Sequence, residues 1–204
     1  MNTVSCSQPR ADAPVCARCS GALKVSCCEL AEGESLATLT LTDVARVQAA
    51  TGWSRRRFVD EEGFSELEAL AYERDRPLYR GYFARGPIRL TLRPVNGACV
   101  FFRPGVGCRL TAAQRPLACR LFPFELWPDG QWSLQVERHG NIGAARAQGG
   151  ACLAVEEATS MEEVLEAMHT TRDEVETLGR QLHEEVRSHA RGRALPLSPD
   201  ADSG

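Results

Sequence analysis

The segment CVFFRPGVGCRLTAAQRPLACRLFPF, residues 99–124, decides how this chain folds. It places Cys99, Cys108 and Cys119 in one stretch that is interrupted by a glycine-rich turn and by an Arg-Pro pair. Cysteines in such a pattern are typical metal ligands, because soft thiolate sulfur suits zinc and iron better than magnesium or calcium. The segment therefore predicts a small domain built around thiolate-bound metal.

A second group of cysteines lies near the N-terminus, in CARCSGALKVSCC, residues 16–28. Cys16 and Cys19 have the two-residue gap of a metal knuckle, and Gly21 permits the backbone turn that a knuckle needs. Cys27 and Cys28 are adjacent, and adjacent side chains of an extended chain point to opposite faces. Either this pair straddles two sites, or one member binds metal and the other packs as a small apolar residue.

The expected compartment favours metal over disulfides. The first residues lack the apolar run of a secretory signal, which predicts a reducing cytoplasm, and the total of nine cysteines is odd. Cys6 lies in the expected N-terminal tail, where an exposed thiol without a role is the preferred interpretation. The expected metal ligands are Cys16, Cys19, Cys27, Cys28, Cys99, Cys108, Cys119 and Cys152. These eight suffice for two four-sulfur sites, or for one cluster with spare cysteines, and zinc and an iron–sulfur cluster are nearly balanced.

Composition excludes several other classes. The net charge of −3 gives a nucleic-acid partner no support, and no segment is long and apolar enough to cross a membrane. No Ser-His-Asp order, phosphate loop or His-Glu-x-x-His motif points to catalysis apart from the cysteines. His139 is a weak candidate ligand, whereas His169, His183 and His189 are expected at the surface. Five arginines lie near cysteines: Arg18, Arg103, Arg109, Arg115 and Arg120. Compensation of thiolate charge is the hypothesis for them, and chance adjacency in an arginine-rich chain is the alternative.

Short elements are expected between the two cysteine groups. Alternation over residues 36–41 predicts a strand, Thr42 predicts the cap of a helix over 43–50, and Gly52 should end that helix. Two further helices are expected over 54–59 and 64–72. Asn96-Gly97 predicts a hairpin between strands 88–93 and 98–102. The remaining expectations are a turn at 103–107, a helical segment capped by Thr111 that carries Cys119, and a hairpin of 124–127 with 132–136.

The C-terminal part predicts a long amphipathic helix over 160–190, opened by the capping box Ser160-Met-Glu-Glu163. Its apolar stripe consists of Val164, Met168, Val175, Leu178, Leu182 and Val186. The stripe is expected to pack on the domain, with a homodimer seam as the alternative. The expected fold class is α+β, with small β-hairpins and short helices around a cysteine–metal cluster over 16–155, the long helix, and disordered tails at 1–15 and 191–204.

The ordered combination of motifs resembles the YkgJ-type cysteine-cluster family. It comprises Cys16-x-x-Cys19, Cys27-Cys28, Leu-Thr-Leu-Thr-Asp43 with Arg46, Cys99-Val-Phe-Phe, Cys108-Arg-Leu, Arg115-Pro116 and Cys119-Arg-Leu-Phe-Pro-Phe124. The resemblance spans about residues 16–152 and implies a zinc- or iron-chelating domain of unassigned cellular role, with the eight cysteines named above as ligands. The gap between Cys19 and Cys27 is longer than in many members, which leaves the placement of the vicinal pair open.

Three functions are consistent with these patterns. The first is a cytoplasmic metal-binding protein whose thiolate site organises the fold. The second is an iron–sulfur enzyme for electron transfer or for methyltransferase-like protein modification, since a related branch includes flagellin lysine-N-methylase; no methyl-donor pocket can be traced in this sequence. The third is a thiol redox sensor that uses Cys27 and Cys28, which would require exposed thiols of low pKa.

Overall fold

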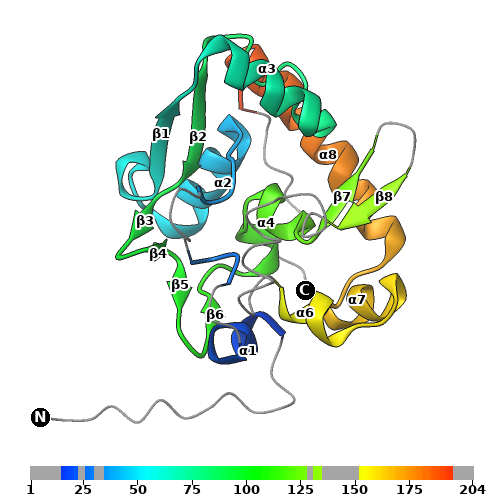
Figure 1. Cartoon of the computed structure of the whole chain (residues 1–204). Helices are drawn as coiled ribbons and strands as arrows, with labels where there is room; N and C mark the ends of the chain where they lie inside the picture. Colours follow the sequence, from blue (N-terminus) through cyan, green and yellow to red (C-terminus); the bar gives the residue numbers. More distant parts are fainter. Residues whose placement is uncertain (1–14, 23–25, 30–34, 128–130, 135–151, 195–204) are drawn as a thin grey trace, which may run out of the picture.

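The computed structural model describes residues 15–22, 26–29, 35–127, 131–134 and 152–194, and these have the α+β architecture that the sequence predicts (Figure 1). The helices are α1 (Val15–Ala22), α2 (Leu41–Thr51), α3 (Glu66–Asp75), α4 (Leu117–Leu121), α6 (Leu153–Glu157), α7 (Met161–Ala167) and α8 (Arg172–Ala190), with 3-10 turns η1 (Arg55–Arg57), η2 (Pro77–Tyr79) and η3 (Ala112–Gln114). The strands are β1 (Val59–Gly63), β2 (Ile88–Leu92), β3 (Pro94–Val95), β4 (Ala98–Cys99), β5 (Phe102–Arg103), β6 (Gly107–Cys108), β7 (Phe124–Leu126) and β8 (Trp132–Leu134). Cys6, His139 and most of both expected tails lie outside the described residues.

The strands pair as antiparallel two-stranded sheets, β1 with β2, β3 with β4, β5 with β6 and β7 with β8. The Asn96-Gly97 turn is confirmed: φ is 53° at Asn96 and 78° at Gly97, the left-handed values that a two-residue hairpin turn requires. The partners differ from the prediction, however, because this turn joins β3 to β4. Strand β2 pairs instead with β1, where Arg89 lies opposite Glu62 and forms an ion pair with it.

Helix α2 begins two residues earlier than the sequence predicts. Thr40, not Thr42, is the N-cap: its hydroxyl accepts a hydrogen bond from the Asp43 N–H, while the Asp43 carboxylate accepts from the Thr40 N–H. Gly52 ends the helix in the left-handed region, as expected. The strand predicted over residues 36–41 is wrong: residues 36–40 are irregular and meet β2 through an isolated bridge between Thr38 and Thr91, and Leu41 already belongs to α2.

The segments after α2 also differ in detail. The helix expected over 54–59 is reduced to η1, and the acidic residues that follow it form β1. The helix expected over 64–72 is α3, capped by Ser65. Thr111 caps η3, whereas Cys119 lies on the separate helix α4, which starts after Pro116. The hairpins at 103–107 and between β7 and β8 are confirmed.

The C-terminal helix predicted over 160–190 is two helices. Ser160 caps α7, and the chain then turns at His169, whose φ is 53°, before Thr171 opens α8 with a capping box to Glu174. Residues 172–190 form the long C-terminal helix of the fold class. The predicted apolar stripe packs into the core: Val164, Val175, Leu178, Leu182 and Val186 are buried, and Met168 packs against them.

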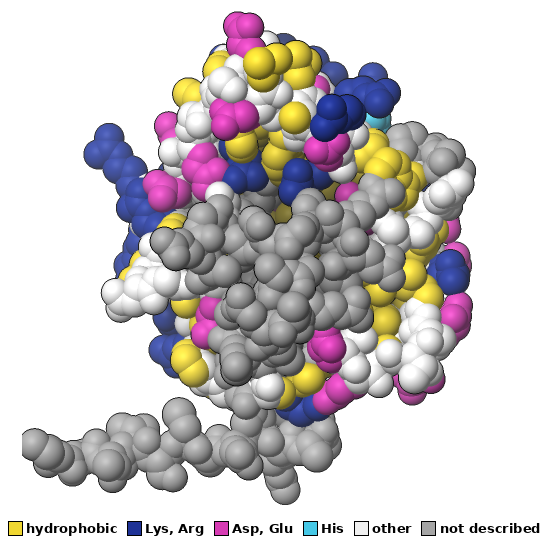
Figure 2. All heavy atoms as spheres, in the orientation of Figure 1, with side chains coloured by type: hydrophobic (Ala, Val, Ile, Leu, Met, Phe, Trp, Pro, Cys, Tyr) yellow, Lys and Arg dark blue, Asp and Glu magenta, His cyan; other side chains and the backbone are white. Residues whose placement is uncertain are grey.

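The apolar interior consists of two clusters. The larger one joins α1, α4, α6, α7 and α8 with the aromatic side chains of Tyr72, Tyr79 and Tyr82. The smaller one joins α2 to the β1–β2 sheet and to Phe101 and Leu110. Figure 2 shows acidic and basic side chains interspersed on one face, and apolar side chains over α3, where Leu67 and Leu70 are exposed. Among the described helices, none combines the length and apolar character needed to cross a membrane.

Candidate metal centre

All eight cysteines that the structure describes line one cavity of about 430 Å³, and all eight are free thiols. They arrive from six separate parts of the chain. Helix α1 carries Cys16 and Cys19, the turn at residues 26–29 carries Cys27 and Cys28, β4 ends at Cys99, β6 ends at Cys108, α4 carries Cys119, and Cys152 is the N-cap of α6. The structure therefore brings every described candidate ligand to the same hollow.

The first wall of the cavity is helix α1, not the knuckle turn that the sequence predicts. Cys16 and Cys19 are three residues apart on this helix, so their side chains share a face. Helix α1 lies beside β6 and α6 (Figure 1). Gly107 in β6 permits the approach: its φ is 86°, and a Cβ there would lie 3.1 Å from the carbonyl oxygen of Cys16.

The second wall is built around the turn at residues 26–29. The Glu29 N–H donates to the Ser26 carbonyl at 2.9 Å, which closes the turn, and the Cys99 N–H donates to the Cys28 carbonyl at 2.7 Å. A further bridge pairs Glu29 with Ala98. These backbone contacts fix the vicinal cysteine pair beside β4.

Burial raises the pKa of most of these thiols further above neutral pH. Loss of solvent raises the pKa of Cys19 to about 11 and that of Cys99 to about 12. Cys119 shows the same direction, because burial and the neighbouring Cys99, Cys28 and Cys108 all raise its pKa. A cation entering the cavity would reverse this balance, because metal binding displaces thiol protons.

Other groups at the cavity favour the thiolate form. Backbone N–H groups of Phe101 and Leu110 act on Cys99 and Cys108, and each lowers the pKa that burial raises. A hydrogen bond from Cys27 lowers the pKa of Cys28 and raises that of Cys27 itself. Cys27 is exposed as a residue, but its thiol faces this bond and the cavity.

The expected charge compensation by arginine is met best by Arg115. Burial raises the pKa of Cys16 and Cys108, and the Arg115 guanidinium opposes this rise; it also adds to the hydrogen bond from Cys27 that lowers the pKa of Cys28. The Arg115 Nε donates to the Leu110 carbonyl at 3.1 Å. Arg18 pairs with Glu157 at 2.8 Å, with Cys19 nearby. Arg120 lies instead among the charges of Arg46, Glu185 and Asp43.

The thiols do not form a preassembled coordination site. Within the described ranges, no three His, Cys, Asp or Glu side chains stand in an arrangement that already fits a metal ion. The sulfurs line the cavity wall, so that binding would require them to close around the ion. The eight thiols suit soft metals, although the carboxylates of Glu29 and Glu125 line the same cavity.

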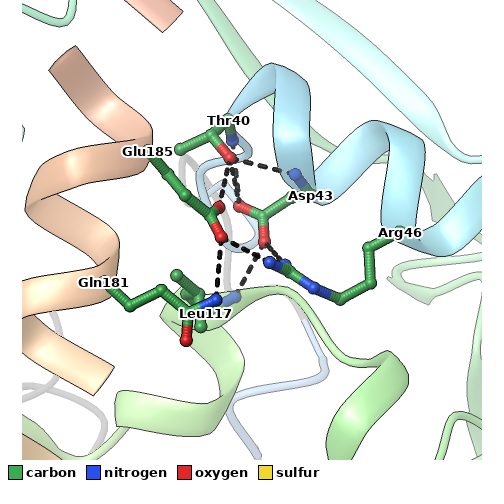
Figure 3. Close-up of polar contacts among 6 residues, drawn as sticks. All are labelled: Thr40, Asp43, Arg46, Leu117, Gln181 and Glu185. Carbon is green, nitrogen blue, oxygen red and sulfur yellow. Dashed lines mark hydrogen bonds and ion pairs between the residues drawn. The ribbon is translucent and has the colours of Figure 1, made fainter. Parts of the chain in front are cut away.

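A buried polar network holds helix α4, and with it Cys119, against α2 and α8 (Figure 3). The Asp43 carboxylate accepts hydrogen bonds from the N–H groups of Thr40 and Leu117, each at 2.9 Å, and forms an ion pair with Arg46. Arg46 also pairs with Glu185 of α8. Because Leu117 is the first residue of α4, Asp43 fixes the start of the helix that presents Cys119.

Sequence reasoning missed Glu185 and misplaced His189. Glu185 is 1% exposed and lies on the buried face of α8 between Leu182 and Val186. Its position inside the apolar stripe of the sequence was the signal that could have predicted a buried charge. Burial raises its pKa, and the charge of Asp43 adds to this. His189, expected at the surface, is 8% exposed and stacks on Tyr82 with ring centroids 4.2 Å apart.

Comparisons of this chain with protein families, with curated proteins and with solved structures found no match.

Proposed function

We propose that this protein binds metal through the cysteines of the cavity, with zinc or an iron–sulfur cluster as the bound group. One observation carries the proposal: eight free thiols from six separated segments line a single hollow. Burial alone would bring cysteines into the interior as small apolar residues, but it would not require all eight described ones to line the same cavity. Membership of the YkgJ-type family is part of the same proposal.

The surroundings of the thiols support metal binding over simple packing. Arg115 and the backbone N–H groups of Phe101 and Leu110 provide positive charge and hydrogen bonds toward sulfur. Such contacts stabilise thiolates, which are the form that binds metal, and they occur around ligating residues in metal proteins generally. The network through Asp43 holds α4 in place, so that Cys119 faces the cavity.

Anaerobic purification followed by analysis of zinc, iron and acid-labile sulfide tests this function. We expect at least one metal ion per chain, and a colourless zinc protein or a brown iron-and-sulfide protein decides the identity of the group. A folded, metal-free protein that takes up neither zinc nor iron would contradict the proposal. If that protein showed only reversible thiol oxidation, a redox function would be favoured; the hydrogen bond from Cys27 that lowers the pKa of Cys28 supports it, whereas the raised pKa of Cys27 does not.

A further inference from the structure

The cysteines of the cavity divide between the two apolar clusters of the interior. Cys19 and Cys152 belong to the larger cluster, and Cys16 packs against it. Cys99 belongs to the smaller cluster, together with the partly buried Cys28, Cys108 and Cys119. These seven thiols fall into the two clusters without overlap, which leaves Cys27 to be assigned.

The first group is held together by α1 and α6. Cys16 and Cys19 share one face of α1, which packs against α6, and Cys152 stands at the N-terminal end of α6. The backbone of Leu153 hydrogen-bonds to the sulfur of Cys19, which brings the residue after Cys152 into contact with that thiol. Three thiols thus lie on or beside two helices that pack together, without yet forming a closed site.

The second group is held together by β-structure and α4. The 2.7 Å hydrogen bond from the Cys99 N–H to the Cys28 carbonyl places these two residues side by side. The β5–β6 hairpin sets Cys108 opposite Phe102, three residues after Cys99. Cys119 approaches from α4, and its thiol is close enough to Cys99, Cys28 and Cys108 for each of them to raise its pKa.

Cys27 completes the first group. Cys28 lies near thiols of both groups, since it acts on Cys16 and Cys19 as well as on Cys119. Apart from this chain neighbour, the thiols near Cys27 are Cys16 and Cys152. Both belong to the group on α1 and α6. The second group already holds four thiols, and the first has three without Cys27.

We infer that the cavity holds two adjacent four-thiolate metal sites, one formed by Cys16, Cys19, Cys27 and Cys152 and the other by Cys28, Cys99, Cys108 and Cys119, with the vicinal pair divided between them. This inference rests on the proposed metal-binding function. A divalent ion with four thiolates carries a net charge of about −2, which calls for nearby positive charge. Arg115 suits both sites, because it acts on Cys16 of the first and on Cys28 and Cys108 of the second.

Native mass spectrometry of the full chain, reconstituted with Zn²⁺ alone under anaerobic conditions, tests the division. We expect two ions in the unmodified protein and in Cys6→Ser, the matched control for loss of a thiol. Cys19→Ser, Cys27→Ser, Cys28→Ser and Cys99→Ser should each retain one. Pairs within a site, such as Cys19→Ser with Cys27→Ser, should also retain one ion, whereas Cys27→Ser with Cys28→Ser should retain none.

Thiol labelling of the unmodified protein checks the same grouping without depending on the folding of any variant. The chain is loaded with one equivalent of Zn²⁺, alkylated with iodoacetamide and mapped by peptide mass. Molecules that hold one ion should protect all four cysteines of one site and none of the other. Joint protection of Cys27 and Cys28 in such molecules would overturn the inference, as would loss of both ions from a single-site variant. Absence of bound zinc in a protein that also takes up no iron would overturn the proposed function as well.

Discussion

Replacement of Asp43 by Asn should destabilise the protein strongly, although the side chain changes by a single atom. Asp43 is fully buried and accepts from the Thr40 and Leu117 N–H groups while it pairs with Arg46. An amide offers one acceptor oxygen instead of two, so at least one of these donors would face an NH₂ group. A buried donor without a partner costs about 1–3 kcal/mol, and breaking a buried ion pair costs about 3–5 kcal/mol. We expect a total loss of about 3–5 kcal/mol in the free energy of unfolding.

Urea unfolding of the metal-free protein measures this loss directly. Asp60→Asn is the matched control, because Asp60 is about half exposed and lies 3.7 Å from Arg93; its replacement should change stability by less than about 1 kcal/mol. Glu185→Gln should cost only about 1 kcal/mol, because it leaves Arg46 paired with Asp43 and removes the carboxylate repulsion that adds to the raised pKa of Glu185.

A local measurement connects the network to the cavity. Asp43 fixes the first residue of α4, so Asp43→Asn should expose Cys119 and accelerate its alkylation in the metal-free protein under folding conditions. The reasoning would be refuted if Asp43→Asn unfolded at the same urea concentration as Asp60→Asn and left the alkylation rate of Cys119 unchanged.

Three further outcomes are expected. Burial lowers the pKa of His189 from 6.5 to about 4, and the nearby charges of Arg85 and Arg55 add to this. Between these two pH values the unfolded chain binds the proton and the folded chain does not, so the free energy of unfolding should fall by at most about 3 kcal/mol. Replacing His189 by Phe should remove that acid loss in denaturant unfolding at pH 7 and 4.5, and an equal loss in both proteins would contradict the assignment. Gly107→Ala should destabilise the protein by at least about 1 kcal/mol more than Gly105→Ala. Both glycines have positive φ, but only at Gly107 would a Cβ come close to the Cys16 carbonyl. Equal changes in melting temperature for the two variants would refute the close approach. Zinc affinity, measured by competition with a chromophoric chelator, should weaken more than about tenfold from pH 7.5 to 6.5, because zinc displaces protons from thiols of raised pKa, and a pH-independent affinity would be incompatible with thiolate ligation.

Local signals in the sequence predicted those parts of the fold that depend on a few neighbouring residues. Asn96-Gly97 adopts left-handed φ values whichever strands the turn connects. Gly52 ends α2 because it too adopts a left-handed φ, which glycine does without steric cost. The break between α7 and α8 had a readable signal as well, since Thr171 and Glu174 form a capping box inside the supposed single helix.

Partnerships across long sequence distances escaped the prediction. The alternation over residues 36–41 fits a strand, but Leu36 and Leu39 are buried within a segment of irregular backbone. Strand β2 pairs with β1 rather than with the strand expected after the Asn96-Gly97 turn. Strand β1 itself was missed, because its acidic run favours an exposed helix when its pairing with β2 is unknown. Likewise, the two-residue gap between Cys16 and Cys19 is the same in a knuckle and on one face of a helix.

The candidate site was predicted as a set of residues but not as an arrangement. All eight cysteines reach the cavity, yet their division depends on contacts such as Cys28 with Cys99, which no local pattern encodes. The adjacency of Cys27 and Cys28 indicated only two possibilities: the two residues bind different metal ions, or one binds metal and the other packs as a small apolar residue. The packing of α1 on α6 supplies the distinction, and it follows from tertiary structure alone.

X-ray absorption at the edge of the bound metal tests the central claim most directly, because it counts the atoms that surround the ion. The account predicts a first shell of four sulfur atoms, at about 2.3 Å if the metal is zinc. A shell made mainly of nitrogen and oxygen would contradict it, since the ion would then be held by residues other than the cysteines of the cavity.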